Sequence, residues 1–273
     1  MGKRIAVVTG ASSGLGQEFV RQLEGVCKGE GALFDECPQE LWVIARREDR
    51  LQALAEVTKI PLRVLPMDLT QKDCIDTIAE LLEHEKPDVM MLINAAGFGR
   101  IGRTMDQTLD ELDGMIDLNC RAAVDMTQLV LPYMKEGGRI LEICSTAAVQ
   151  PITRLNVYAA TKAFLYHYSR ALRAELLPMG IYVTAVCPYW VKDTEFIALA
   201  DQKNDEKNPE IANYFLASQK EDVVRHALTD AALRMPVSTP GPVSTLHRFI
   251  RKLFPIDVLL LAWEAVRRLS SPE

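Results

Sequence analysis

Short apolar runs alternate along the chain with longer stretches in which apolar residues recur at helical spacing. Six runs are typical of buried strands, because they are rich in β-branched residues or leucine and end in Gly, Asn, Ser, Asp or Pro. These runs are Ile5–Val8, Leu41–Ala45, Leu62–Leu65, Val89–Ile93, Ile140–Cys144 and Ile181–Val186. Strands that are apolar on both faces predict a parallel sheet covered by helices on both sides.

Helical patterns fill the intervals between these runs. They are Leu15–Leu23, Leu51–Val57, Asp73–Glu83, Leu109–Met134 and Val157–Leu177. Regular strand–helix alternation predicts a doubly wound α/β fold, here as a single domain over residues 1–273. A seventh short strand is expected near Met235–Ser238.

Three segments interrupt the alternation. Gly25–Glu40 is long for a connection between a helix and a strand, and we interpret it as a surface excursion. Residues 189–222 mix aromatic side chains with the charged run Asp201–Glu210, and they predict a substrate loop. Residues 247–269 form a basic, apolar helical segment whose second part starts at Pro255. This segment has three alternative roles: it packs on the body or a partner subunit, it closes the substrate pocket, or it lies on a membrane surface.

Composition narrows the class of protein. The chain has 273 residues, of which 48% are hydrophobic and 25% charged, which excludes a disordered or fibrous protein. A net charge of −6 and the lack of a basic stripe with interleaved aromatics argue against nucleic-acid binding. The six cysteines are scattered, which favours reduced thiols and a cytoplasmic location. The longest apolar run is well short of the ~18 residues that a membrane-spanning helix needs.

A phosphate-binding turn is predicted directly after the first strand. Ile5–Val8 runs into Thr9, Gly10, Ala11, Ser12, Ser13, Gly14, Leu15 and Gly16, and a helix follows. Glycines let backbone N–H groups approach an anion, and the helix N-terminus adds about half a positive charge. This context fits a dinucleotide cofactor, with a glycine-rich turn that binds no ligand as the alternative.

Residues after the second and third strands bear on the choice of cofactor. A carboxylate after the second strand would favour NAD, whereas this chain has Arg46 and Arg47, which suit the 2′-phosphate of NADP. The alternative is a solvated helix start in which the arginines pair with Glu48 and Asp49. Asp68, followed by Leu69, is a candidate partner for the adenine amino group, or else a helix cap or a partner of the turn at Thr70.

A tyrosine and a lysine are candidates for proton transfer. Tyr158 and Lys162 lie four residues apart in a helical stretch and therefore share a face. An ammonium nearby favours the phenolate, so Lys162 is expected to lower the pKa of Tyr158 towards the working pH. Ser145 ends the fifth strand, at the edge where open α/β sheets place ligands. Asn119, a mediocre helix former, stands inside the long fourth helical stretch.

Together these signals resemble the classical short-chain dehydrogenase/reductase (SDR) family. The matching motifs are TGASSGLG at 9–16, NAAG at 94–97, Asn119, Ser145, YAATK at 158–162 and Pro188. The resemblance implies a Rossmann fold with a seven-stranded parallel sheet, usually in a homodimer or homotetramer.

The resemblance also implies roles for single residues. Tyr158 is the general acid or base, Lys162 holds the nicotinamide ribose and Ser145 binds the substrate oxygen. Asn119 anchors a water in a proton relay, and Asn94 supports the central strand. The remaining cofactor positions are Ala95, Ala96, Pro188, Val191 and Thr194.

The chain departs from the family pattern after Pro188, where Tyr189 stands in place of the usual glycine and Trp190 follows it. They are candidates for substrate contact, with wall packing as the alternative. Cys27 and Cys37 have no partners at zinc spacing, so no metal is expected. His84, His167, His226 and His247 are isolated and are expected at the surface or in packing.

The predicted function is an NADP(H)-dependent oxidoreductase that interconverts a ketone and a secondary alcohol, with NAD as the less favoured cofactor. A medium to large apolar substrate, steroid-like or with an acyl chain, is expected from the apolar residues around 189–220. The alternatives are a 3-oxoacyl thioester reductase and a non-catalytic NADP-binding regulator.

Overall fold

A seven-stranded parallel sheet, in the order β3-β2-β1-β4-β5-β6-β9, forms the centre of the protein. The computed structural model describes residues 2–26, 33–34, 36–200 and 217–270. The strands are β1 (Arg4–Thr9), β2 (Glu40–Ala45), β3 (Leu62–Pro66), β4 (Asp88–Asn94), β5 (Arg139–Ile143), β6 (Tyr182–Val186) and β9 (Val237–Ser238). The strand order reverses between β1 and β4, and a crevice for a ligand is expected at this point.

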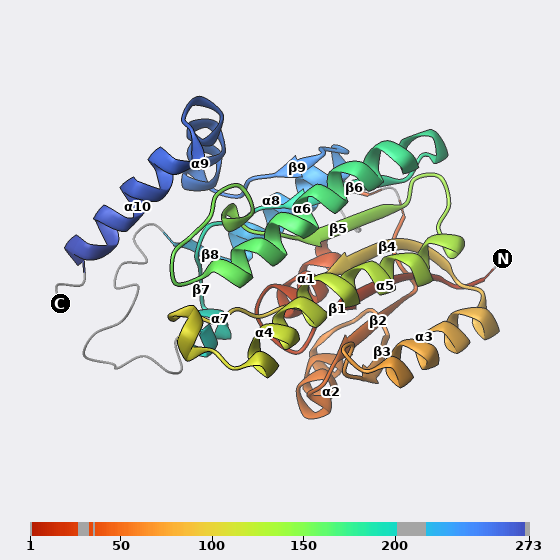
Figure 1. Cartoon of the computed structure of the whole chain (residues 1–273). Helices are drawn as coiled ribbons and strands as arrows, with labels where there is room; N and C mark the ends of the chain where they lie inside the picture. Colours follow the sequence, from red (N-terminus) through yellow and green to blue (C-terminus); the bar gives the residue numbers. More distant parts are fainter. Residues whose placement is uncertain (1, 27–32, 35, 201–216, 271–273) are drawn as a thin grey trace.

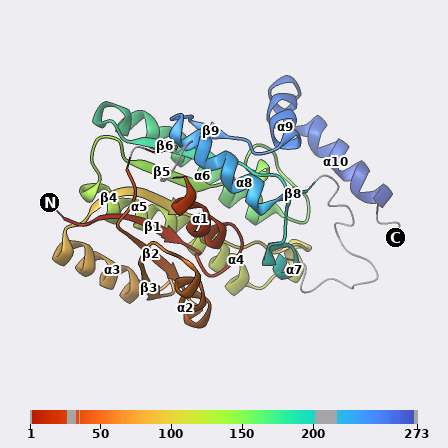
Figure 2. The same cartoon turned by 180° about the vertical axis from the view of Figure 1, so that it is seen from behind.

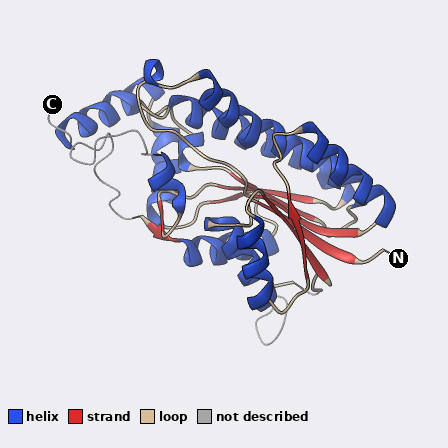
Figure 3. Cartoon of the chain, turned by 90° about the horizontal axis from the view of Figure 1, so that it is seen from below, coloured by secondary structure: helices blue, strands red, loops and turns tan. Residues whose placement is uncertain are grey.

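Helices cover both faces of the sheet (Figures 1 and 3). One face carries α1 (Gly14–Gly25), α2 (Glu48–Val57) and α8 (Lys220–Ala232), of which α1 and α8 lie in front of the sheet in Figure 2. The other face carries α3 (Lys72–Glu85), α5 (Ala122–Val130) and α6 (Asn156–Leu176). A short helix, α4 (Leu109–Ile116), precedes α5.

Two apolar cores result from the alternation of side chains along each strand. In β1, Ala6 and Val8 join the core beneath α1, whereas Ile5 and Val7 join the core beneath α5 and α6. Both sets are fully buried, which explains why the strands read as continuous apolar runs.

The predicted sheet is confirmed. Each of the six predicted strands matches an observed strand to within one residue at either end, and the short seventh strand is β9. The strands are recognisable in the sequence because most of them are buried on both faces. Apolar residues therefore dominate the runs, although Arg63, Glu142 and Thr184 interrupt three of them.

The predicted helix Leu109–Met134 is in fact divided into several parts. After α4, residues Asp117–Arg121 form a π-helical turn, α5 follows, and a 3-10 turn covers Leu131–Tyr133, which contains Pro132. Proline cannot donate the next helical hydrogen bond, which accounts for the break at the end of α5. The π-helical turn holds Asn119, and such turns occur often at functional sites.

The segment after β6 carries small elements. These are β7 (Val191–Lys192), α7 (Glu195–Ala200) and β8 (Ser218–Gln219), of which the two strands pair with each other. The charged run Asp201–Glu210 of the predicted substrate loop lies outside the described residues. The same holds for Cys27 and most of the middle of the predicted excursion Gly25–Glu40, whose Leu33 and Phe34 pack against the core beneath α1.

Two helices end the described chain, as the sequence predicted. They are α9 (Pro242–Leu253) and α10 (Ile256–Ser270), with Pro255 between them. The first helix begins five residues earlier than predicted, at Pro242, a residue that is favoured at the first position of a helix. Across the described residues, no helix combines the length and apolar character needed to cross a bilayer.

Candidate active site

The turn between β1 and α1 forms a backbone cradle. Gly10 and Gly14 have φ angles of +67° and +53°, which disfavour residues with a side chain. A Cβ at Gly10 would lie 2.8 Å from the main chain of Ala96, and one at Gly16 would lie 2.3 Å from the carbonyl oxygen of Gly10. The cradle therefore depends on glycine at these positions.

The first turn of α1 suits an anion. Ser13 is the N-cap residue of α1, and no described side chain caps the N–H groups at the start of this helix. The first turn also lacks acidic residues. The N-terminal amides and the helix dipole are thus directed at a cavity of about 760 Å³, a size typical of small-molecule sites.

Arg47 joins this cradle to the end of β2. Its guanidinium donates to the Ser12 hydroxyl oxygen at 3.1 and 3.2 Å, and to the Ser13 hydroxyl oxygen at 2.7 Å. It also donates to Glu195, the first residue of α7, at 2.7 Å. Arg46 is 74% exposed, and its guanidinium lies 3.9 Å from the Asp68 carboxylate. Two guanidinium groups and two hydroxyls therefore border the cavity beside the cradle.

Asp68 is a partner of the turn at Thr70, which is one of the alternatives that the sequence leaves open. One of its carboxylate oxygens accepts hydrogen bonds from the Thr70 amide at 3.0 Å and the Thr70 hydroxyl at 2.8 Å. Asp68 and Leu69 both line the cavity, so the adenine contact stays a prediction.

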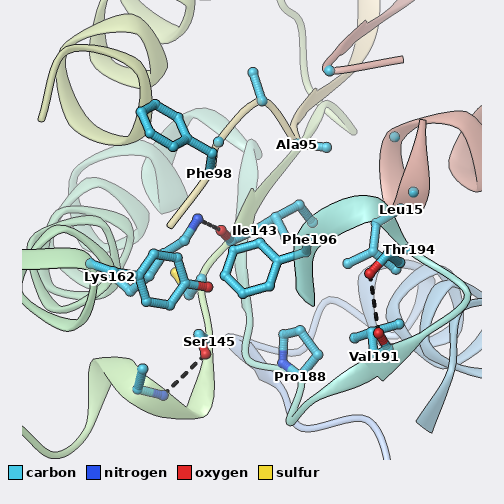
Figure 4. Close-up of a pocket in the computed structure, with 18 of the residues that line it drawn as sticks. Leu15, Ala95, Phe98, Ile143, Ser145, Lys162, Pro188, Val191, Thr194 and Phe196 are labelled. Atoms are coloured by element: carbon cyan, nitrogen blue, oxygen red, sulfur yellow. Dashed lines mark hydrogen bonds between the residues drawn. The ribbon is translucent and has the colours of Figure 1, made fainter. Parts of the chain in front are cut away.

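Ser145, Tyr158 and Lys162 meet at the other end of the cavity. Ser145 follows β5, and its hydroxyl oxygen accepts a hydrogen bond of 3.1 Å from the Ala147 amide. Tyr158 and Lys162 are both buried and lie one turn apart on α6. The Lys162 ammonium donates to the Ile143 carbonyl oxygen at 2.6 Å (Figure 4), and it lies 5.7 Å from the centre of the Tyr158 ring.

Burial dominates the ionisation of this pair in the ligand-free chain. It raises the pKa of Tyr158 well above the usual value for tyrosine, although a hydrogen bond with Ser145 acts in the opposite direction. Burial also lowers the pKa of Lys162. The expected lowering of the Tyr158 pKa is thus wrong for the net shift, because burial destabilises the phenolate and is the largest effect on this group.

Two asparagines lie beside the cavity and do not line it. Asn94 donates to the Glu142 carboxylate at 2.9 Å and to the Thr127 hydroxyl at 3.1 Å, which ties β4 to β5 and α5. Asn119 accepts from the Phe98 amide at 2.9 Å and donates to the Phe98 carbonyl, also at 2.9 Å. Asn119 therefore holds the main chain at Phe98, which lines the cavity, whereas Asn94 joins β4 to its neighbours.

The remaining predicted site residues line one cavity together. They are Gly10, Ser12, Ser13, Gly14, Leu15, Gly16, Arg46, Arg47, Asp68, Leu69, Ala95, Ala96, Ser145, Tyr158, Lys162, Pro188, Tyr189, Trp190, Val191 and Thr194. Residues from seven separate segments thus converge on one site. In the described part of the chain, no group of three or more His, Cys, Asp or Glu side chains could hold a metal ion.

Sequence reasoning missed several aromatic residues of the site. Phe98, Phe196 and Trp263 line its apolar end, and Figure 4 labels the first two. The centre of the Phe196 ring lies 5.1 Å from that of Tyr158. Phe98 directly follows the NAAG motif, which could have signalled its place. His247, which was expected at the surface or in packing, also lines the cavity. Burial lowers its pKa.

Comparisons with known proteins agree with this geometry. The short chain dehydrogenase family matches residues 4–205. An uncharacterised oxidoreductase from Staphylococcus aureus (strain N315) is 30% identical over 207 residues, which make up 75% of this chain and 84% of that protein. The family match spans the segments that form the cradle and the Ser145–Tyr158–Lys162 group.

Solved structures extend the likeness over most of the chain. A short-chain dehydrogenase from Sphingobium yanoikuyae in complex with NADPH has a TM-score of 0.73 and 27% identity, covering 96% of this chain and 94% of that one. A bulky-bulky ketone specific alcohol dehydrogenase from Comamonas testosteroni has a TM-score of 0.69 and 25% identity, covering 93% and 92%. With the family match over residues 4–205, the chain belongs to the short-chain dehydrogenase/reductase family of oxidoreductases.

Proposed function

We propose that the chain is an NADP(H)-dependent oxidoreductase that interconverts a ketone and a secondary alcohol on a medium to large apolar substrate. One observation carries the proposal: Ser145, Tyr158 and Lys162 line the same cavity as the glycine cradle and Arg47. A dinucleotide that lies along this cavity would have its phosphates at the cradle and its nicotinamide at Tyr158.

The protein's own residues supply the proton chemistry. When bound, the nicotinamide supplies or accepts the hydride. During carbonyl reduction, Tyr158 donates a proton to the oxygen on which negative charge develops, and the Ser145 hydroxyl donates a hydrogen bond to the same oxygen. In this proposal Lys162 exchanges its bond to the Ile143 carbonyl for the ribose hydroxyls, and its charge then favours the phenolate during alcohol oxidation.

The cofactor preference rests on Arg46 and Arg47. A 2′-phosphate at the end of β2 would receive charge-assisted hydrogen bonds from these guanidinium groups and from Ser13. Neither position holds a carboxylate, which would accept a hydrogen bond from the free 2′-hydroxyl of NAD. The structural likeness to a dehydrogenase that binds NADPH supports the same choice.

The substrate class rests on the aromatic end of the cavity. Phe98, Trp190, Phe196 and Trp263 present large apolar surfaces near Tyr158. Such a lining suits a steroid-like or acyl-chain ketone better than a small polar one. The likeness to an alcohol dehydrogenase that is specific for bulky-bulky ketones supports this choice.

The test is NADPH consumption against three substrate groups, namely steroid ketones, 3-oxoacyl thioesters and small ketones. We expect turnover with bulky ketones, and little turnover with NADH in place of NADPH. Tyr158→Phe should lower kcat by at least about a hundredfold while NADPH still binds. Binding of NADPH with no turnover on any substrate would indicate a regulator, and selective turnover of thioesters would replace the ketone assignment.

We further propose a cytoplasmic location and a homodimer or homotetramer. Cys74, Cys120, Cys144 and Cys187 carry free thiols, which supports a reducing compartment. Light scattering of the purified protein would test the oligomeric state.

A further inference from the structure

The most apolar stripe of α9 faces away from the protein. Leu246, Phe249 and Leu253 lie on one face of the helix, and they are 59%, 64% and 64% exposed. Ser244 is buried on the opposite side, and Val243 and His247 line the cavity. In a surface helix the apolar stripe normally faces the core, so its outward orientation in α9 calls for an explanation.

The next helix continues this surface. Phe254 at the bend is 48% exposed, and Val258 and Leu261 on α10 are 48% and 72% exposed. Ile256, at the start of α10, is also exposed. We call these seven residues the terminal apolar face: Leu246, Phe249, Leu253, Phe254, Ile256, Val258 and Leu261. It lies on two helices at the end of the molecule opposite the N-terminus (Figure 1), and large exposed apolar side chains gathered in one region are typical of an interaction site.

The inner side of the two helices is fixed to the catalytic body. The Arg251 guanidinium donates to the Val149 carbonyl oxygen at 2.8 Å, just after the turn that begins at Ser145. Thr153 donates to the Glu264 carboxylate at 2.8 Å, and Leu259 and Trp263 line the cavity. The terminal apolar face is therefore held in place, with its back against the cavity wall.

The charge of this segment differs in sign from that of the chain. Residues 242–270 contain five basic and two acidic residues, a net charge of +3 in a chain whose total is −6. Lys252 is exposed beside the apolar stripe of α9, and Arg248 is partly exposed. Short helices that combine an apolar face with basic residues are typical of segments that lie in the interface of an anionic membrane.

We propose that α9 and α10 bind the surface of an anionic lipid bilayer through the terminal apolar face. The helices have 12 and 15 residues, which is too short to span a hydrocarbon core of ~30 Å but sufficient to lie along its boundary. A second copy of the chain fits this face less well, because a two-fold contact would bring two segments of charge +3 together. Attachment at this face would place the wall of the catalytic cavity next to the lipid.

The test is flotation of the full chain with two kinds of vesicle, phosphatidylcholine alone and phosphatidylcholine mixed with phosphatidylglycerol. We expect binding to the mixed vesicles that weakens at high salt. The triple variant Leu246→Gln, Phe249→Gln, Leu253→Gln should bind these vesicles at least about tenfold more weakly, because three exposed apolar side chains no longer enter the lipid.

A matched control removes the same number of exposed apolar side chains elsewhere. The variant Met105→Gln, Leu109→Gln, Leu177→Gln, whose three positions are all exposed, should bind vesicles like the wild type. A charge variant, Arg248→Gln with Lys252→Gln, should lose the preference for the mixed vesicles. Lys59→Gln with Lys72→Gln is its control, at exposed sites far along the chain.

Three results would overturn the proposal. In the first, the wild type fails to float with either vesicle at low salt. In the second, the triple variant floats as well as the wild type. In the third, light scattering would show that the triple variant splits an oligomer while neither protein binds lipid, which would assign the face to a second copy. NADPH titration and circular dichroism on each variant separate these outcomes from misfolding and from failure of the proposed function.

Discussion

Glu195 accepts a hydrogen bond of 2.7 Å from Arg47, and this contact joins the start of α7 to the residue that precedes α2. Arg50 binds the other carboxylate oxygen of Glu195. Hydrogen bonds from Arg50 and Arg47 lower the pKa of Glu195 to about 2. Because α7 also carries Phe196 against Tyr158, the pair connects the two ends of the cavity. A carboxylate thus occupies one side of the arginine that is proposed to bind a 2′-phosphate.

Replacing Glu195 by glutamine is expected to tighten the binding of NADPH. The change removes a negative charge beside the proposed phosphate site, so the dissociation constant for NADPH should fall about threefold. NADH has no 2′-phosphate, and its affinity should not change. Fluorescence titration with both cofactors measures the effect. Glu48→Gln, at an exposed position next to Arg47 in the sequence, controls for net charge. Equal changes in the dissociation constants of NADPH and NADH would show that Glu195 does not affect phosphate recognition.

Replacing Arg47 by glutamine is expected to weaken NADPH binding about ten- to a hundredfold. The variant loses charge-assisted hydrogen bonds to the phosphate, whereas NADH affinity should change by about twofold at most. Arg50→Gln is the matched control, because Arg50 binds Glu195 but is absent from the lining of the cavity. If Arg47→Gln left the NADPH-to-NADH ratio unchanged, the preference for NADP would have to lie elsewhere.

Replacing Gly16 by alanine is expected to damage the cradle. The new Cβ would lie 2.3 Å from the Gly10 carbonyl oxygen, so the turn must shift. NADPH affinity should fall at least about tenfold, and the free energy of unfolding should fall by about 1–3 kcal/mol. Gly25→Ala, near the end of the same helix, meets no described atom within 4 Å and should leave both quantities near the wild-type values or raise stability slightly. Chemical denaturation and cofactor titration check both variants.

Replacing Glu142 by glutamine is expected to change the pH dependence of stability. Burial raises the pKa of Glu142 to about 8, although hydrogen bonds from Asn94 and Thr127 act in the opposite direction. Between pH 4.5 and 8 the folded protein keeps a proton that the unfolded chain releases, so the stability of the wild type should fall as pH rises through this range. The loss is on the order of 5 kcal/mol.

Urea denaturation across this pH range tests the Glu142 prediction. The curve of Glu142→Gln against pH should be flatter than that of the wild type, because its side chain does not titrate. Glu83→Gln, at an exposed position on α3, should follow the wild type. Parallel curves for all three proteins would mean that Glu142 contributes no linked proton.

The fold could be predicted closely from the sequence because its strands are buried on both faces. Val7 and Val8 point to opposite cores and are both apolar, so the run is visible without any knowledge of the contacts. The cradle and the Tyr158–Lys162 pair were visible for another reason. Their chemistry depends on residues that lie close together in the sequence.

Other features depend on contacts between distant residues, and no local pattern signals them. Glu195 meets Arg47 across 148 positions, and Phe196 reaches Tyr158 from a short helix that no periodicity marks. Asn94 is the last residue of the buried strand β4 and was expected beside the cofactor, yet its amide donates to Glu142 and Thr127. The high pKa of Tyr158 has the same origin, because burial is a property of the folded chain.

The π-helical turn at Asp117–Arg121 makes this part of the chain sensitive to the insertion or deletion of a residue. Each residue of an α-helix advances the chain by about 100°, and a π-helical turn accommodates one residue more than an α-helical turn does. A relative that lacks one residue here would continue as a regular helix, and α4 would be rotated with respect to α5. Asn119 would then no longer face Phe98, so an insertion or deletion in these five positions should be tolerated far less than one in a surface loop.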